Sequence, residues 1–135
     1  MNGLDPASQA PVPPAGGQRL PRAYRLDPAG YKSTFDGGES LASRFFAMWI
    51  LRSPEGGVGR VGTVASKRTF HDAVQRNRAR RRIRETYRLN EHRLKRGYDI
   101  VIVARSQSVN GDFAAMQQSF LRQCKKLKLL REEEA

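Results

Sequence analysis

The sequence predicts an α+β fold, a small two-layer sandwich of helices packed on a sheet, with its elements in the order α-β-β-α-β-α. Two strand-sized apolar runs, at residues 45–51 and 98–104, supply the sheet. Two longer stretches, at 73–90 and 113–127, repeat their apolar residues every three to four positions, as amphipathic helices do. The chain has 135 residues, which is enough for one domain with a single modest core.

A short first helix is expected from Pro28 to Phe35. Asp27 can act as its N-cap, and Pro28 suits the first helical position because the missing N–H would have no partner there. Gly37-Gly38 is expected to end the helix. Tyr31 and Phe35 are four residues apart and therefore share one helix face.

The run 45–51 is the clearest strand, and it is followed by a turn at 54–57 and a second strand at about 60–66. Alternation along the first strand places Trp49 on one face, together with Phe45, Ala47 and Leu51. The other face carries Phe46, Met48 and Ile50. Because only a short turn separates the two strands, we expect them to form a hairpin.

The longest helix is expected from about Ala73 to Asn90, with Asp72 as its N-cap. Its core stripe consists of Ala79, Ile83 and Tyr87, which recur at intervals of four residues. Gly97 separates this helix from the strand at 98–104. A turn at Asn110-Gly111 and a cap at Asp112 then lead into the final helix.

The two ends of the chain differ from the domain at residues 23–130. Residues 1–22 contain five prolines and a Gly16-Gly17 pair, so we expect a disordered tail, and 131–135 form a short acidic tail. The N-terminus lacks the basic and apolar regions of a secretion signal, and Cys124 is the only cysteine, so a cytoplasmic protein is expected. No apolar run approaches the roughly 20 residues of a membrane-spanning helix, and no membrane partner is expected.

Positive charge is concentrated between Arg60 and Arg105. This segment holds 14 basic and four acidic residues, so it carries +10 of the formal net charge of +12. Helical spacing groups five polar residues beside the core stripe: Asn77, Arg80, Arg81, Arg84 and Arg88. Glu85 is positioned to neutralise Arg81 and cannot balance the whole face. Because arginine binds phosphate bidentately, we expect a polyanion, with nucleic acid favoured, although an anionic lipid surface would fit the charge equally well.

Three aromatic residues, Tyr31, Phe35 and Trp49, have two possible roles. They could be part of the core, or they could form a platform on which single-stranded bases stack. The sequence does not favour one role over the other.

The residues suggest no catalytic or metal-binding group on the polypeptide. His71 and His92 have no cysteine or paired carboxylates nearby, and the acidic residues are too few and scattered for a two-metal nuclease centre. If RNA is cleaved, we expect that the polypeptide does not supply the chemistry.

Two neighbouring blocks resemble the strand and the "RNR" helix of the bacterial ribonuclease P protein family: Val64–Arg68, which reads VASKR, and Ala73–Glu85, which reads AVQRNRARRRIRE. Gly97–Val101, which reads GYDIV, resembles the strand that follows in the family. Arg25-Leu26 and the pattern from Tyr31 to Gly38 resemble its first helix. The likeness covers about residues 22–130.

The resemblance implies a ribosomal-S5-domain-2-like fold with a left-handed β-α-β crossover around the RNR helix. It also implies that the protein, in one copy per catalytic RNA, helps that RNA remove the 5′ leader of precursor tRNA, while the RNA holds the catalytic Mg²⁺. Tyr31, Phe35 and Trp49 would line the cleft for the leader. The RNA-binding residues would be Lys67, Arg68, Arg76, Asn77, Arg78, Arg80, Arg81, Arg84 and Arg88.

The sequence departs from the family pattern at two places. The turn Thr69–Asp72 is one residue longer than usual, and the first helix begins with Asp27-Pro28-Ala29-Gly30 instead of lysines, which predicts a lower affinity for the leader. Two other functions remain open from the residues alone. One is a non-catalytic RNA-binding module, such as a ribosomal or assembly protein, and the other is a protein-only nuclease, which the lack of a carboxylate cluster disfavours.

Overall fold

A computed structural model describes residues 25–53 and 59–131 of the chain. The expected N-terminal tail at 1–22, the turn at 54–57 and residues 132–135 of the acidic tail lie outside this range. The elements are α2 (Pro28–Gly37), β1 (Glu39–Ala42), β2 (Phe46–Arg52), β3 (Arg60–Val64), α3 (Ala73–Asn90), the 3-10 turn η2 (Glu91–Arg93), β4 (Tyr98–Ala104), α4 (Gln107–Asn110) and α5 (Phe113–Lys126).

The α+β class is confirmed, and every expected helix and strand is present. The structure adds three short elements that the sequence did not reveal, β1, η2 and α4. Strand β1 reads ESLA and is largely exposed, so it has no apolar run to mark it.

The three aspartates expected as N-caps all accept a backbone N–H: Asp27 from Gly30 at 2.8 Å, Asp72 from Val74 at 2.8 Å and Asp112 from Ala115 at 3.0 Å.

The sheet has the strand order β1-β2-β4-β3. Strand β4 pairs antiparallel with β2, from Phe46 opposite Ala104 to Arg52 opposite Tyr98, and parallel with β3. The expected hairpin between β2 and β3 is therefore wrong. Strand β4 lies between them because it is buried along most of its length and takes a central place, while β2 forms its hairpin with β1.

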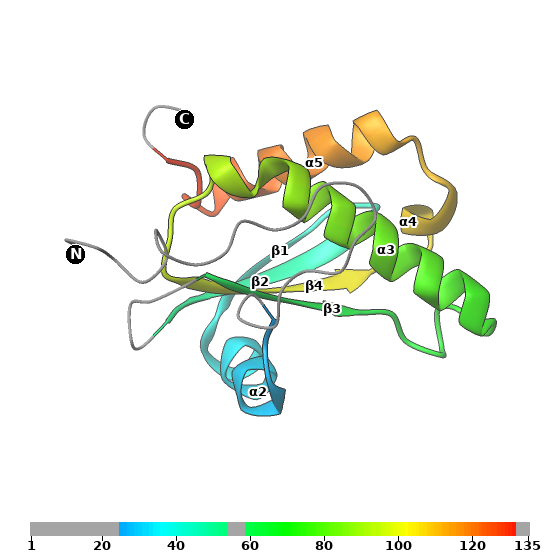
Figure 1. Cartoon of the computed structure of the whole chain (residues 1–135), viewed down its shortest axis with the longest axis horizontal. Coiled ribbons are helices and arrows are strands. Elements are labelled where there is room, and N and C mark those ends of the chain that lie inside the picture. Colours follow the sequence, from blue (N-terminus) through cyan, green and yellow to red (C-terminus); the bar gives the residue numbers. More distant parts are fainter. Residues whose placement is uncertain (1–24, 54–58, 132–135) are drawn as a thin grey trace.

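Helices cover both faces of this sheet unequally (Figure 1). Helices α3 and α5 lie side by side on one face, and the short α2 lies against the other face. Strands β3 and β4 are adjacent and parallel with α3 between them in sequence, so a β-α-β unit is present. The left-handed crossover implied by the resemblance stays a prediction.

The main core lies between the sheet and the pair α3 and α5. Phe46, Met48 and Ile50 are buried there, as the alternation of β2 predicted. The expected place of Phe45 on the Trp49 face is wrong, because Phe45 precedes β2 and is buried in the same core as Phe46. The expected stripe of α3 is also confirmed, because Ala79, Ile83 and Tyr87 are at most 3% exposed. Helix α5 contributes its own apolar face: Met116, Phe120 and Cys124 are completely buried. This packing fixes the rotation of α3 and so decides which of its arginines face outward.

Candidate nucleic-acid interface

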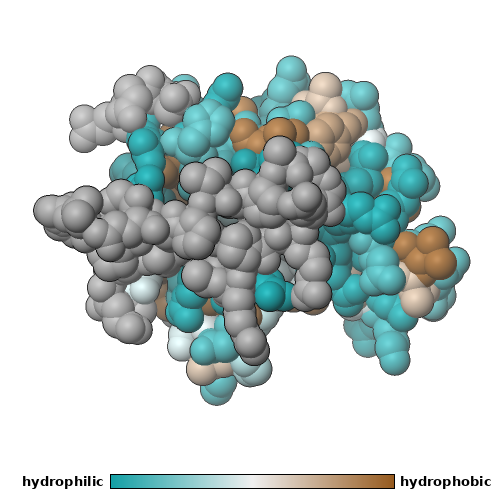
Figure 2. Space-filling model, viewed as in Figure 1, coloured by the Kyte–Doolittle hydropathy of each residue, from teal (hydrophilic) through white to brown (hydrophobic). Residues whose placement is uncertain are grey.

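The outward face of α3 presents the expected polar group. Asn77, Arg81 and Arg84 are exposed, and Arg80 and Arg88 are half-buried at the margin of the same face. Arg80 donates to the side-chain oxygen of Asn77 at 3.0 Å, which holds its guanidinium on the surface. Hydrophilic residues also dominate the end of the molecule where α3 begins, on the side shown in Figure 2. The helix therefore carries a row of cations directed away from the core.

Glu85 neutralises a different arginine from the one expected. It accepts two hydrogen bonds from Arg88, at 3.1 and 2.6 Å, whereas its expected partner was Arg81. The hydrogen bond to Glu85 raises the pKa of Arg88 above its ordinary value. The side chain of Arg81 has no ion pair or hydrogen bond within the described residues. The positive charge of the face is thus reduced at its Arg88 end and remains near Arg81.

Arg76, Arg78 and Arg82 of the same helix bond to the protein itself. Arg76 donates to the carbonyls of Phe70 and His71, at 2.9 and 3.2 Å, and closes the turn before the helix. Arg78 donates from Nε to the carbonyl of Val109 at 3.0 Å, so it lies toward α4. Of the expected RNA-binding residues on this helix, Arg76 and Arg78 are therefore also used to hold neighbouring segments.

Arg82 is the arginine most involved in the fold. Its Nε donates to the carbonyl of Ser108 at 2.8 Å, and its terminal nitrogen donates to the carbonyl of Gly111 and contacts Sδ of Met116. Burial and the charge of Arg78 lower the pKa of Arg82, while Asp112 raises it. The sequence could not separate Arg82 from its neighbours, because the segment that it binds lies 26 to 34 residues further along the chain.

Lys67 and Arg68 lie in the turn between β3 and α3, where both are exposed. The longer turn has a structural reason, because Phe70 within it is only 3% exposed and belongs to the core. Ser66 accepts the backbone N–H of Thr69 through its hydroxyl at 3.2 Å, which tightens the turn. The two cations are thus held on the surface next to the first turn of α3.

The three expected aromatic residues come together between α2 and the sheet. The rings of Phe35 and Trp49 meet edge to face, with centroids 5.0 Å apart and an interplanar angle of 73°. Tyr31 reaches the carbonyl of Thr63 on β3 at 3.5 Å. Its ring lies directly over Gly62, where any Cβ would overlap it. Phe35 is 39% exposed, and Tyr31 and Trp49 are half-buried, so the aromatic group is accessible from outside.

The sheet adds residues beside this aromatic group that the sequence analysis missed. Register places Ala47, Val103 and Val64 on the same sheet face as Trp49, and all three are half-buried. These residues come from three strands, so only the strand pairing could reveal that they are neighbours. They form an apolar floor beside the exposed edge of the aromatic group.

A partly buried ion pair lies on the α2 side of the sheet. Arg60 binds the carboxylate of Asp99 through two nitrogens, at 3.1 and 2.9 Å, and Asp99 is only 2% exposed. Gly30 of α2 lies close to Arg60, since a Cβ on Gly30 would be 3.6 Å from its guanidinium. Asp99 therefore has a structural role, since it holds Arg60 beside α2.

The described residues contain no group of three or more histidine, cysteine or acidic side chains that could hold a metal ion. His71 and His92 are both exposed and lie at opposite ends of α3. Within the same residues, no helix is long and apolar enough to cross a membrane.

A basic helix on one face of the sheet and an accessible aromatic group on the other, on a small α+β frame, are typical of an RNA-binding protein. Comparison with known proteins gives the class more narrowly. The family model described as Ribonuclease P matches residues 20–128. Relatives named ribonuclease P protein component include that of Natranaerobius thermophilus, 34% identical over 100 residues, which are 74% of this chain and 85% of the relative. That of Symbiobacterium thermophilum is 36% identical over 100 residues, 73% of this chain and 86% of the relative.

Solved structures agree with the sequence comparison. The RNase P protein of Staphylococcus aureus superposes with a TM-score of 0.70 at 27% identity, covering 82% of this chain and all of that one. The RNase P protein of Thermotoga maritima gives a TM-score of 0.66 at 26% identity, covering 76% of this chain and 96% of that one. The chain belongs to the ribonuclease P protein family. It is therefore a protein subunit of the ribonuclease P holoenzyme, an endoribonuclease that processes the 5′ leader of tRNA.

Proposed function

We propose that α3 of this subunit binds the catalytic RNA of ribonuclease P, and that the cleft between α2 and the sheet binds the single-stranded 5′ leader of precursor tRNA. The observation that carries the proposal is the outward row of cations on α3, within which Arg81 is exposed and has no ion pair or hydrogen bond among the described residues. A surface of this kind attracts phosphates and gains free energy when their counterions are released.

The arginines of α3 divide into two groups. Arg80, Arg81 and Arg84 face outward and would contact RNA phosphates, with Asn77 holding Arg80 in place. Arg76 and Arg78 donate to backbone carbonyls and would contact RNA only with the donors that remain. Lys67 and Arg68 extend the outward group beyond the first turn of the helix.

The aromatic cleft suits an unpaired strand. Bases can stack on accessible aromatic rings without regard to sequence, and the half-buried valines beside Trp49 would exclude water from a stacked base. Phe35 supports this use, because an aromatic ring that served only the core would not be 39% exposed. The subunit would therefore recognise a leader by its single-stranded form.

Magnesium belongs to the RNA in this proposal. This part of the proposal rests on the resemblance to the family, in which the catalytic RNA holds the magnesium ions. The cations of α3 would instead reduce repulsion where two RNAs meet and so strengthen the binding of the precursor and of magnesium together. One protein per catalytic RNA and a cytoplasmic location, where precursor tRNA is processed, complete the proposal.

Reconstitution with the catalytic RNA tests the α3 contact. We expect Arg80→Ala/Arg84→Ala to weaken RNA binding, and each lost phosphate contact should lower the slope of log K against log salt by about 0.9. Affinity would be measured by filter binding at several salt concentrations, and leader cleavage by a precursor tRNA assay at low magnesium. The matched control is Lys95→Ala/Arg96→Ala, which removes two exposed cations from the turn before β4.

An unchanged salt slope in the α3 variant would contradict the contact. Failure of the wild-type protein to stimulate cleavage at low magnesium and near-physiological salt would contradict the proposed function as a whole. Circular dichroism of both double variants would show that they remain folded.

A further inference from the structure

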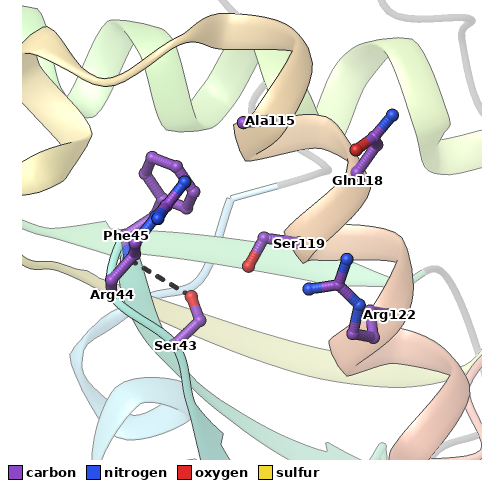
Figure 3. A pocket seen from close by; sticks show the side chains of 7 residues that line it. All are labelled: Ser43, Arg44, Phe45, Ala115, Gln118, Ser119 and Arg122. Carbon is purple, nitrogen blue, oxygen red and sulfur yellow. Dashed lines mark hydrogen bonds between the residues drawn. The ribbon is translucent and has the colours of Figure 1, made fainter.

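A second basic site lies at the other edge of the sheet, between α5 and the turn that joins β1 to β2. The site is a surface pocket of about 370 Å³, within the range of small ligand sites. Ser43, Arg44 and Phe45 line it from the turn, and Gln118, Ser119 and Arg122 line it from α5 (Figure 3). Strand β1 is at one edge of the sheet and β3, which leads to α3, is at the other, so this pocket is separate from the cation row of α3.

The turn side of the pocket is held in one conformation by its own hydrogen bonds. The hydroxyl of Ser43 accepts the backbone N–H of Phe45 at 3.2 Å and that of Phe46 at 3.4 Å. Arg105 donates to the carbonyl of Ser43 at 3.0 Å. The guanidinium of Arg44 lies 4.8 Å from the centre of the Phe45 ring, a cation–π contact that limits its motion.

The helix side offers donors without protein partners. Ser119 is only 6% exposed and lines the pocket, yet its hydroxyl forms no hydrogen bond within the described residues. Because this oxygen is not fully enclosed by the protein, it can donate to a ligand or to water in the pocket. Arg122 is exposed beside it and, within the described part of the chain, has no ion pair.

Positive charge predominates around the pocket, and the nearest acidic side chain on α5 is its N-cap, Asp112, which accepts the backbone N–H of Ala115. From residue 113 to residue 131 the sequence contains five basic residues and no acidic residue. Arg122 also borders a second hollow of about 280 Å³, which Arg93 and Lys125 line as well. The positive surface therefore continues from the pocket along the outer side of α5.

We propose that this pocket binds a backbone phosphate of RNA, with Arg44 and Arg122 on either side and the Ser119 hydroxyl as a third donor. A phosphodiester offers two anionic oxygens, and arginine forks bind such oxygens bidentately. The RNA is the catalytic RNA, so the inference rests on the subunit binding that RNA as proposed above. The subunit would then contact RNA at both edges of its sheet, through α3 on one side and through α5 on the other.

The test measures the binding of three double variants of the full chain to the refolded catalytic RNA. Arg44→Ala/Arg122→Ala should lower the salt slope by about 0.9, the effect of one lost phosphate contact, and weaken binding by about tenfold at low salt. Lys95→Ala/Arg96→Ala is again the control for the loss of two exposed charges, and thermal melting followed by circular dichroism checks the fold. Arg80→Ala/Arg84→Ala is measured in the same series.

The outcomes separate the two proposals. We call Arg80→Ala/Arg84→Ala the α3 variant and Arg44→Ala/Arg122→Ala the α5 variant. If the α3 variant lowers the salt slope and the α5 variant has the same slope as the Lys95→Ala/Arg96→Ala control, the pocket does not bind RNA and the function proposed for α3 stands. If neither variant lowers the slope, both proposals fail. If the α5 variant keeps its RNA affinity but loses binding to poly-glutamate that the wild type shows, the pocket takes an acidic protein segment, which overturns the inference.

A tethered probe gives an independent measurement. Gln118→Cys places a thiol in the wall of the pocket, and the native Cys124 is completely buried, so an iron chelate would attach at position 118 alone. Hydroxyl radicals from this chelate should cut the bound catalytic RNA within one short stretch of nucleotides. Absence of any local cutting, with the complex formed, would overturn the inference.

Discussion

Trp49 shows how the structure gives a residue a role that its type leaves open. The strand alternation places it on the face opposite the main core, and α2 covers that face only in part. Its ring meets Phe35 edge to face and remains half-buried. A tryptophan in this position can support α2 and still offer a surface to a base. Its function is therefore tested by comparing the binding of an RNA that has the single-stranded leader with one that lacks it.

For Trp49→Ala we expect a loss of about 1–3 kcal/mol in the binding of precursor tRNA, because one base loses its stacking partner. Mature tRNA without a leader should bind as well as before. Binding of both RNAs to the reconstituted holoenzyme measures the difference. Tyr98→Ala is a suitable control, since Tyr98 is a half-buried aromatic residue that contacts Arg52 outside the cleft. Equal losses for the two RNAs would show that Trp49 is structural.

Among the elements, α3 combines two tasks that the sequence does not separate. One side binds α4 and the residues around it through Arg78 and Arg82, and the outward side carries the cations proposed to meet RNA. The number and spacing of arginines in the sequence do not show which arginines bind the protein and which face outward. The difference appears only when the carbonyls of Ser108, Val109 and Gly111 are placed beside the helix by the return of the chain through β4.

We expect Arg82→Met to destabilise the protein by about 2 kcal/mol, because carbonyls that accept from a charged donor would lose their partner. Arg81→Met should change the free energy of unfolding by less than about 0.5 kcal/mol, since that side chain is exposed and unpaired within the described residues. Urea unfolding of both variants measures the two values. A similar change in both would show that Arg82 does not hold α4.

At the scale of the whole molecule, the protonation of Cys124 depends on the packing of the core around it. It lies on α5 and is completely buried, and this burial raises the pKa of its thiol from 9.0 to about 12. The folded state therefore keeps the proton where the unfolded state loses it. Stability contributed by the protonated thiol is complete below pH 9 and is lost as the pH rises toward 12.

At pH 10 the wild type should have lost about 1 kcal/mol more stability, relative to pH 8, than Cys124→Ala has lost. Denaturant unfolding at the two pH values gives this difference, and the common effect of lysines and tyrosines cancels between the two proteins. Parallel pH dependences would indicate that the thiol is accessible to water in the folded state.

The sequence by itself determined the helices and strands with clear periodicity, the three aspartate caps, the position of the basic helix and the family. These features depend on residues close together in the chain, and periodicity and capping are local properties. The longer turn before α3 was also visible in the sequence, although its cause, the burial of Phe70, was not.

The tertiary structure decided the features that depend on distant segments. It placed β4 between β2 and β3, so the expected hairpin does not form. It also paired Glu85 with Arg88 instead of Arg81. It also assembled the cleft floor from three strands and the pocket beside α5 from two segments about 70 residues apart. Strand order and side-chain pairing are set by burial and packing over the whole molecule, so they cannot be predicted from the local pattern of residues.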